Sequence, residues 1–343
     1  MKYKLKFSIC MPVYNGALVI KPTLRSILSQ NFDNYELIIV DDCSKDDTEK
    51  VVKSFREKRI RYFKNKSNLG YSLNLEECRK KAKGDIIYLM GQDDILGKDA
   101  LLNTYKAFML SKDIGAATRP YFWFDRDINK PVRAKGQLNP QKDEVVKITD
   151  DRKKIIALFS TLDQLSGLAL RREYIDVPFH KDIFPCHVYP FASIFKKHPA
   201  VFLKDYNLAV RIGSSQCRSP RMYKRKTSYI YDKSPIQSWV DMFNGVFYET
   251  KFKDFRKYMI KNFVAVNYVG LVQIRNYARY QYLLQEIWML LKYRWQNVYS
   301  PQFWFFSLGC LLMPPVLLIP LVDWYKSRVN SLRFKKIKFK YQE

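Results

Sequence analysis

The sequence predicts an α/β fold in which a mostly parallel sheet is covered by helices on both faces. Three observations predict it: short apolar runs alternate with segments of helical apolar spacing, polar groups follow the apolar runs, and 47% of the 343 residues are hydrophobic. With 15% aromatic residues and only 12 glycines and 15 prolines, the composition excludes disordered, collagen-like and linker-dominated chains.

The alternation is clearest in the first third of the chain, where four short apolar runs indicate strands. We expect strands at 7–13, 35–40, 60–64 and 85–90, and helices at 22–30, 44–57, 72–83 and 99–110. The middle is less periodic, with strands at 167–170 and 201–203, and the chain is helical and aromatic from about 238 onward. These changes predict domains at 1–115, 116–230 and 231–343, the last a helical, aromatic-rich, membrane-associating region with a basic tail.

The charge of the chain is strongly positive, because 60 Lys and Arg residues stand against 33 Asp and Glu residues, a formal net charge of +27. Such a charge predicts an anionic partner: nucleic acid, an anionic membrane face or a phosphorylated substrate. The six cysteines are scattered and form no CxxC pair, which favours a reducing compartment and argues against a zinc or redox motif. No signal-peptide apolar region precedes the first strand, so we expect the protein on the cytosolic side.

Polar groups follow three of the predicted strands: Tyr14-Asn15, Asp41-Asp42 and Gln92-Asp93-Asp94. Ligands of parallel sheets bind beyond the carboxyl ends of the strands, so these groups predict a binding site at that edge. Turn formation and helix capping are the alternative explanation for acidic residues after a strand. That alternative explains one polar group after a strand well. It explains three such groups at the same edge of a sheet poorly.

A nearly apolar stretch at 303–322 has about the length of a bilayer core and is interrupted by Pro314-Pro315 and Pro320. Basic residues flank it on both sides: Lys292 and Arg294 before it, and Lys326, Arg328, Arg333, Lys335, Lys336, Lys338 and Lys340 after it. A true span would place one basic flank outside, against the positive-inside tendency. We therefore expect a re-entrant or interfacial segment on an anionic membrane surface; a span and a buried helical hairpin are the alternatives.

Four segments together resemble the ordered motifs of family-2 glycosyltransferases with the GT-A fold, over about residues 5–110. They are Ser8–Asn15, Ile38–Ser44, Asn68–Gly70, and Gly84–Met90 leading to Asp93-Asp94. Each motif alone is weak, but four in this order, spacing and strand–helix context make a specific pattern.

The resemblance implies a nucleotide-sugar site along the sheet edge. The donor-binding residues would be Pro12, Tyr14 and Asp41 around the base, Asp42, Asn15, Asn68 and Gly70 nearby, and Asp93 on the ribose. Asp94 would coordinate a Mn²⁺ or Mg²⁺ ion that bridges the donor diphosphate and neutralises charge on the leaving group. The aspartate that the family often has two positions before Asp93 is Gly91 here.

The general base is less clearly marked. Gly167–Arg172 resembles the segment that precedes an acidic pair in the family, yet that pair is missing, which leaves Asp182 and His187 as candidates. His187 would act as base or as an extra metal ligand; a histidine packed for structural reasons is the alternative. Arg218, in a basic stretch, would contact the diphosphate as part of a loop that closes over it, and a solvated run of charges is the alternative.

These features predict an inverting, metal-dependent glycosyltransferase at the cytoplasmic face of the membrane, bound peripherally or by a re-entrant segment. It would move one sugar from a nucleotide-sugar, UDP being the commonest in the family, to a polyprenyl-diphosphate-linked saccharide in surface polysaccharide assembly. Transfer to polyprenyl phosphate is the alternative within enzymes. Outside enzymes, the basic and aromatic residues of 275–295 would suit a nucleic-acid-binding protein, although no nucleic-acid module is recognised, and a pseudo-enzyme is a further alternative.

Overall fold

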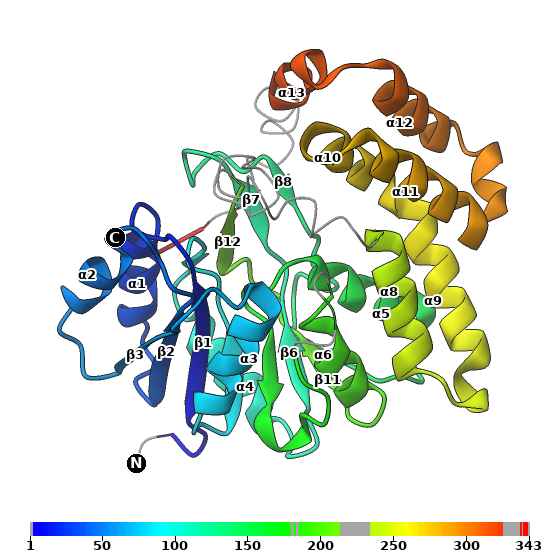
Figure 1. The fold of residues 1–343 in the computed structure, drawn as a ribbon. Coiled ribbons are helices and arrows are strands. Elements are labelled where there is room, and N and C mark those ends of the chain that lie inside the picture. Colours follow the sequence, from blue (N-terminus) through cyan, green and yellow to red (C-terminus); the bar gives the residue numbers. More distant parts are fainter. Residues whose placement is uncertain are drawn as a thin grey trace. The chain divides into compact units, whose positions relative to one another are not determined.

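The computed structural model describes residues 3–179, 182, 185–212, 234–324, 337 and 339–341. The chain divides into two compact units, one comprising 1–182, 186–212 and 334–343, and the other comprising 183–185 and 213–333 (Figure 1). The end of the chain thus belongs to the same unit as its beginning. The boundary predicted near residue 115 stays a prediction.

The first unit is built on an eight-stranded sheet in the order β3-β2-β1-β4-β10-β6-β11-β9. The strands are β1 Phe7–Val13, β2 Tyr35–Asp41, β3 Ile60–Lys64, β4 Ile86–Leu89, β6 Ala116–Thr118, β9 Glu144–Val146, β10 Ala169–Arg171 and β11 Ala200–Phe202. β3, β2, β1 and β4 run parallel, whereas β10 is antiparallel to both β4 and β6. The predicted α/β class is confirmed, and the sheet is rich in parallel pairs without being wholly parallel.

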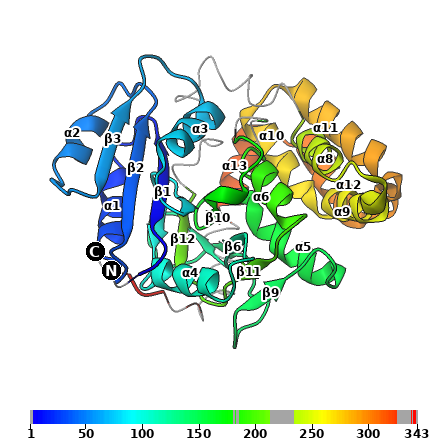
Figure 2. The same cartoon turned by 90° about the horizontal axis from the view of Figure 1, so that it is seen from below.

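Helices cover both faces of the parallel strands. The helices of this unit are α1 Ile20–Leu28, α2 Thr48–Lys53, α3 Tyr71–Lys81, α4 Ala100–Met109, α5 Arg152–Ser160 and α6 Val188–Phe195. α1 and α2 lie on one side of β2 and β3, and α3 packs on the other side, against β1 and β2 (Figure 2). All seven residues of β1 and of β2 are buried, which explains their nearly continuous apolar sequences.

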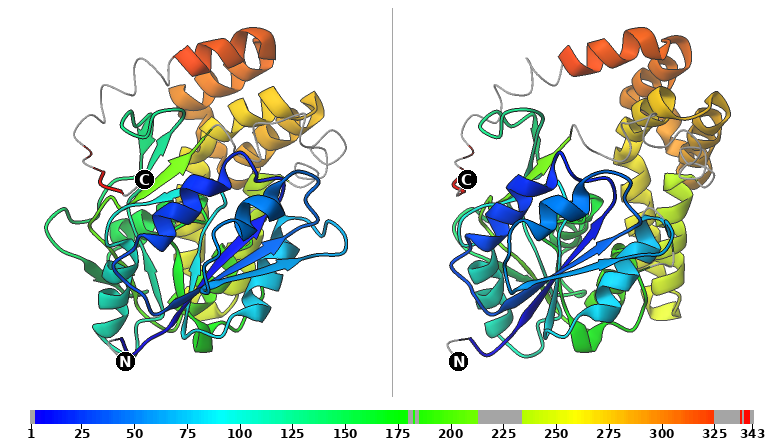
Figure 3. Two further views of the ribbon diagram at one scale, coloured as in Figure 1. Left: turned by 90° about the vertical axis from the view of Figure 1, so that its left-hand side faces the viewer. Right: turned by 60° about the vertical axis from the view of Figure 1, so that its left-hand side comes forward.

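A second sheet in this unit has the order β5-β12-β7-β8, with β5 Ile95–Leu96, β7 Phe122–Phe124, β8 Arg133–Ala134 and β12 Leu208–Arg211. The β7–β8 hairpin rises beside α1 in both views of Figure 3. Phe122 and Phe124 form a small apolar core, against which Ile337, Phe339 and Tyr341 of the C-terminal segment pack. The amide N–H of Lys98 donates to the Lys340 carbonyl over 2.7 Å, which holds this segment against the start of α4.

Two predicted elements differ from the structure in instructive ways. The helix expected at 44–57 is the shorter α2, because the polar side chains before it bond to the loop after β1: Ser44 Oγ accepts from the Asn15 amide, and Asp46 from the Ala17 amide. The helix also ends early, at Lys53, and Arg56, three residues further on, lies in the left-handed region (φ 47°). The strand expected at 167–170 is β10, which begins two residues later because Gly167 adopts a positive φ of 81°.

Gly84 allows the chain to approach the first strand closely. A Cβ at this position would lie 2.7 Å from backbone atoms of Lys6, Phe7 and Ser8. We therefore expect Gly84→Ala to lower the free energy of unfolding by about 3 kcal/mol, because backbone beside a buried strand must move. Urea denaturation measures this, with Gly136→Ala as control, since a Cβ there meets nothing within 4 Å. Equal unfolding midpoints for the two variants would contradict the prediction.

The second unit is helical and consists of α8 Pro235–Val246, α9 Lys253–Val266, α10 Gly270–Tyr277, α11 Tyr280–Tyr293, α12 Pro301–Leu312 and α13 Pro315–Trp324. Its core contains Val264, Leu271, Leu283 and Leu290. The buried Glu286 of α11 accepts hydrogen bonds from the Ser234 hydroxyl and from the Ile236 amide, 3.0 Å away. This carboxylate therefore satisfies the first turn of α8.

The apolar stretch at 303–322 lies in α12 and α13, which are separated at Met313 and Pro314, where two successive prolines lack the amide N–H groups that would extend α12. Pro320, by contrast, lies within α13 and does not interrupt it. Within the described parts of the chain, no helix has the length and apolar character needed to cross a membrane. Lys340 is the one basic residue of the predicted tail that the structure describes, and the other six lie outside the described residues.

Candidate active site

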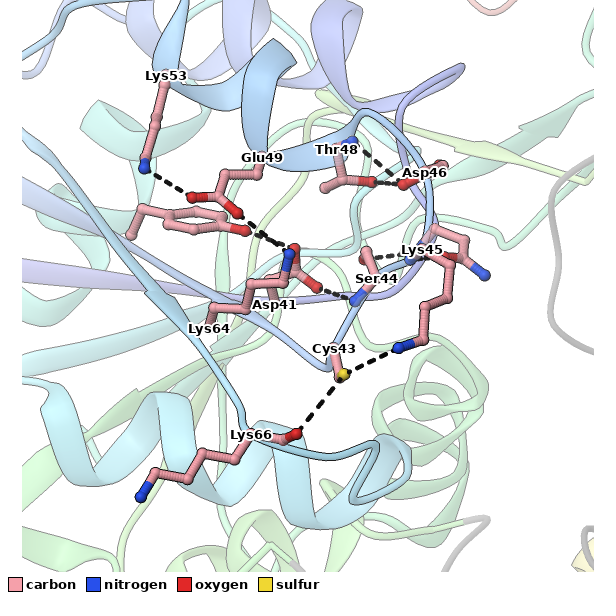
Figure 4. A network of polar contacts seen from close by, with 12 residues as sticks. Asp41, Cys43, Ser44, Lys45, Asp46, Thr48, Glu49, Lys53, Lys64 and Lys66 are labelled. Atoms are coloured by element: carbon pink, nitrogen blue, oxygen red, sulfur yellow. Dashed lines mark hydrogen bonds and ion pairs between the residues drawn. The ribbon is translucent and has the colours of Figure 1, made fainter.

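Asp41 closes β2 at the carboxyl edge of the sheet and is fully buried. Its Oδ1 accepts from the Ser44 amide over 2.7 Å, and its Oδ2 accepts from the hydroxyl of Tyr62 on β3 (Figure 4). Burial, together with the hydrogen bond to Asp41, raises the pKa of the Tyr62 phenol, so Tyr62 remains a donor. Asp41 is thereby fixed in one orientation at the place predicted for the nucleotide base.

Asp42 organises the loop that leads into α3. Its two carboxylate oxygens accept from the backbone amides of Leu69 (2.7 Å) and Gly70 (2.8 Å), and its carbonyl accepts from the Asn68 side chain over 3.1 Å. Gly70 has a positive φ of 88°, which lets the loop present both amides to one carboxylate. The structure therefore brings Asp42, Asn68 and Gly70 together, as the motifs predict.

The loop after β1 is tied to the other two motifs. The Tyr14 amide donates to Oε1 of Gln92 over 2.9 Å, and the Gln92 amide group donates back to the Tyr14 carbonyl over 3.2 Å. Asn15 lies in the left-handed region (φ 47°) and accepts from the Lys45 amide through its side chain. Pro12 lies inside β1, paired with Val40. Gln92 is thus the link between the predicted base pocket and the Asp93-Asp94 pair.

Asp94 is 1% exposed, and three groups contact its carboxylate. Oδ2 accepts from the Gln164 side chain and from the Ser166 hydroxyl, and Oδ1 accepts from the Arg211 amide over 3.0 Å. Burial, and after it the charge of the neighbouring Asp93, raises the pKa of Asp94 to about 7. Asp94 is therefore a carboxylate that the fold holds in place and whose charge nothing nearby fully neutralises.

The sequence analysis missed the segment that surrounds Asp94. Ser166 accepts from the Gly91 amide over 2.8 Å and donates to Asp94, so it occupies the space beside Gly91. A Cβ on Gly91 would lie 3.0 Å from Asp94 Oδ2 and 3.2 Å from Ser166 Oγ. The departure from the family's aspartate therefore has a physical reason: Ser166 and Asp94 leave little room for a side chain there.

The donor set suits a divalent cation only in part. In the described portion of the chain, no group of three or more His, Cys, Asp or Glu side chains is arranged to hold a metal ion. Mg²⁺ characteristically binds through one or two carboxylates and substrate phosphates, keeping several waters. The adjacent carboxylates of Asp93 and Asp94 fit that requirement, because a cation would relieve the repulsion that raises the pKa of Asp94.

The two candidates for the general base lie in different surroundings. His187 is 5% exposed, its Nε2 donates to the Leu162 carbonyl over 2.8 Å, and burial lowers the pKa of its ring to about 4. This histidine therefore fixes the segment that carries Gln164 and Ser166, and Asp182 is also largely buried. Arg218 lies outside the described residues, and its predicted contact with the diphosphate stays a prediction.

The parallel-rich α/β sheet, with loops and a buried aspartate at its carboxyl edge, agrees with the GT-A fold that the motifs imply. The family described as "Glycosyl transferase family 2" matches residues 8–175. Residues 8–175 of this chain therefore belong to the family-2 glycosyltransferases, and the assignment made from the motifs is confirmed.

Curated relatives align with about a third of the chain. An uncharacterized glycosyltransferase of Haemophilus influenzae is 30% identical over 125 residues, which are 36% of this chain and 50% of that protein. The GalNAc(5)-diNAcBac-PP-undecaprenol beta-1,3-glucosyltransferase of Campylobacter jejuni is 32% identical over 99 residues, which are 28% of this chain and 32% of that protein. The alignments thus span half or less of these relatives.

Solved structures resemble the fold over nearly the whole chain. TarS of S. aureus in complex with UDP-GlcNAc has a TM-score of 0.61 and 16% identity, with 97% of this chain and 90% of that chain covered. The mannosyltransferase PcManGT of Pyrobaculum calidifontis in complex with GDP-Man and Mn²⁺ has a TM-score of 0.52 and 15% identity, with 90% and 87% covered. At these identities the likeness is one of fold.

Proposed function

We propose that this chain is an inverting, metal-dependent glycosyltransferase that moves one sugar from a nucleotide-sugar to a lipid-linked saccharide. One observation carries the proposal: hydrogen bonds join the predicted motif residues into one edge of the sheet, with Tyr14 bonded to Gln92, and Asp42 bonded to Leu69 and Gly70. Residues that are far apart in the sequence thereby lie together at the carboxyl edge of the sheet.

The donor would lie along this edge, with its base near Asp41 and its diphosphate near Asp93 and Asp94. These two aspartates would hold Mn²⁺ or Mg²⁺ together with the phosphates, and the ion would neutralise charge on the departing nucleoside diphosphate. The named contents of the similar structures, UDP-GlcNAc in one and GDP-Man with Mn²⁺ in the other, support a nucleotide-sugar and a metal.

An acceptor hydroxyl would displace the nucleoside diphosphate from the anomeric carbon with inversion, and a base would take its proton. Asp182 is the better of the two candidates, because the low pKa of His187 and its bond to Leu162 leave that ring a weak proton acceptor. Asp182→Asn would then lower kcat far more than KM.

A panel of nucleotide-sugars, each with Mn²⁺ or with EDTA, tests the donor site. Binding to the folded state raises the melting temperature by mass action, and we expect one nucleotide class to do so more strongly with Mn²⁺. Transfer is then assayed on polyprenyl-diphosphate saccharides and, for the alternative acceptor, on polyprenyl phosphate. Equal stabilisation by every nucleotide-sugar, or by none, would count against the proposal.

The proposed acceptor class is supported by the name of the Campylobacter relative, which includes undecaprenol linked through PP. The helical unit supports a membrane location, because large apolar side chains on α12 and α13 are exposed: Phe305 (74%), Leu312 (80%), Val316 and Leu317. Exposed apolar surface of this kind marks sites of membrane or protein interaction. We propose that these helices lie on the cytoplasmic face of the membrane, bound peripherally or as a re-entrant segment.

We expect the double variant Phe305→Ser, Leu312→Ser to bind vesicles that contain anionic lipid at least tenfold more weakly. Each large apolar side chain contributes about 1.5–3 kcal/mol when it leaves water. Vesicle co-sedimentation measures the partitioning, and Leu18→Ser with Leu110→Ser, two exposed leucines of the first unit, is the matched control. Undiminished binding by the helical-unit variant would exclude this face as the membrane contact.

A further inference from the structure

A cavity of 410 Å³ lies in the first unit, between α1, the second sheet and the C-terminal segment. Three arginines line it: Arg25 on α1, Arg126 in the loop after β7, and Arg211 at the end of β12. Phe124 and Tyr341 provide aromatic walls. The cavity thus gathers cations from three separate parts of the fold.

The positive charge in the cavity is largely uncompensated. Within the described residues, no carboxylate forms an ion pair with Arg25, Arg126 or Arg211. Asp127, the acidic lining residue, is itself paired with Lys130 at 3.1 Å and accepts from the Asn129 amide.

Arg211 connects the cavity to the candidate active site. Its guanidinium lies over the Phe124 ring, 4.7 Å from the centroid, its Nε donates to the Asp93 carbonyl, and its backbone amide donates to Asp94 Oδ1. Ile95, which also lines the cavity, follows Asp94 directly. The cavity therefore adjoins the aspartate pair.

We propose that this cavity binds the phosphate or diphosphate group of the acceptor, an inference that rests on the proposed function. Guanidinium groups bind phosphate oxygens bidentately, and several of them suit a group with more than one negative charge. The donor is a less suitable occupant, because no described residue of 12–15, 41–44 or 62–70, around which its base would lie, lines the cavity.

The first test measures binding without catalysis. Calorimetry on the full chain in EDTA, with inorganic pyrophosphate as the probe, compares the wild type with Arg25→Ala/Arg126→Ala. We expect the double variant to lose at least tenfold in affinity, and Lys21→Ala/Lys106→Ala, which removes the same charge outside the cavity, to bind as the wild type does. The proposal would be overturned if both double variants lost the same affinity for pyrophosphate, or if UDP displaced pyrophosphate from the wild type.

The second test separates the acceptor from the donor. With a diphosphate-linked saccharide as acceptor, the arginine variant should raise the acceptor KM about tenfold and leave the donor KM unchanged. When the same saccharide is supplied as an uncharged alkyl glycoside, the acceptor KM and the donor KM of the arginine variant should equal those of the wild type. The proposal would be overturned if the donor KM rose, or if the acceptor KM rose equally for the charged and the uncharged acceptor. If the wild type transfers no sugar, the proposed function is refuted. The pyrophosphate titration would still show whether the cavity binds a diphosphate group.

Discussion

Asp94→Asn is expected to lower kcat by about a hundredfold to a thousandfold while leaving the fold as stable as the wild type or more so. Loss of one preorganised electrostatic contact at a reacting centre has an effect of this size. Asparagine has the shape of aspartate but carries no charge, so the cation that Asp93 and Asp94 would share loses a charged ligand.

The stability half of this expectation comes from the surroundings of Asp94. Burial and the charge of Asp93 raise its pKa to about 7, so ionising this carboxylate at neutral pH costs more free energy in the folded than in the unfolded chain. A neutral side chain avoids that cost, in keeping with the strain that functional sites often carry. Transfer assays and thermal unfolding are measured on the same preparations, with Asp113→Asn, an exposed aspartate bonded to His198, as control. Retained transfer, or an unfolded variant, would contradict the prediction.

The sequence patterns were informative where the relevant contacts are local. The strand at 7–13 has the predicted bounds, because apolar residues buried on both faces produce a run that reads directly as a strand. The strand at 60–64 also has the predicted bounds, although its residues are only partly buried or exposed. The polar groups after β1, β2 and β4 lie at one edge because parallel strands end together. The spacing of Asp41, Asp42 and Asp93-Asp94 could therefore be interpreted without coordinates.

The segment around Asp94 was missed because its position depends on a long-range pairing. Gly167 donates to the Leu89 carbonyl and Leu89 donates to the Leu168 carbonyl, which inserts β10 beside β4 in the antiparallel direction. The apolar run at 167–170 predicts this strand but neither its partner nor its direction. Gln164 and Ser166 reach Asp94 only through this pairing, and the signal that would have indicated them is the presence of these two polar residues shortly before Gly167.

The C-terminal segment was also beyond a local interpretation. Its basic residues were assigned to a tail, yet Ile337, Phe339 and Tyr341 pack on the second sheet of the first unit. Their alternation with lysines is a strand-like pattern with one apolar side. The sequence alone does not show whether this apolar side packs on a sheet or on a membrane. That depends on residues far away in the sequence, here Phe122 and Phe124.

Asp42→Ala is expected to weaken donor binding through the loop it holds, without direct involvement in the chemistry. The substitution leaves the amides of Leu69 and Gly70 without their acceptor, and each hydrogen bond to a charged group contributes about 1.5–3 kcal/mol. The free energy of unfolding should fall by about 3 kcal/mol, and the donor KM should rise about tenfold or more with a smaller change in kcat, because the loop containing Asn68 loses its position beside Asp41.

Asp42→Asn provides the matched comparison, since asparagine keeps one acceptor oxygen for these two amides and the same side-chain volume. Its donor KM and unfolding midpoint should lie between those of the wild type and of Asp42→Ala. Isothermal titration with the preferred nucleotide, together with urea unfolding, checks both quantities. If Asp42→Ala lowers kcat and leaves donor affinity unchanged, the carboxylate acts in the transfer step itself, and its role in holding the Asn68–Gly70 loop does not account for its place in the motif.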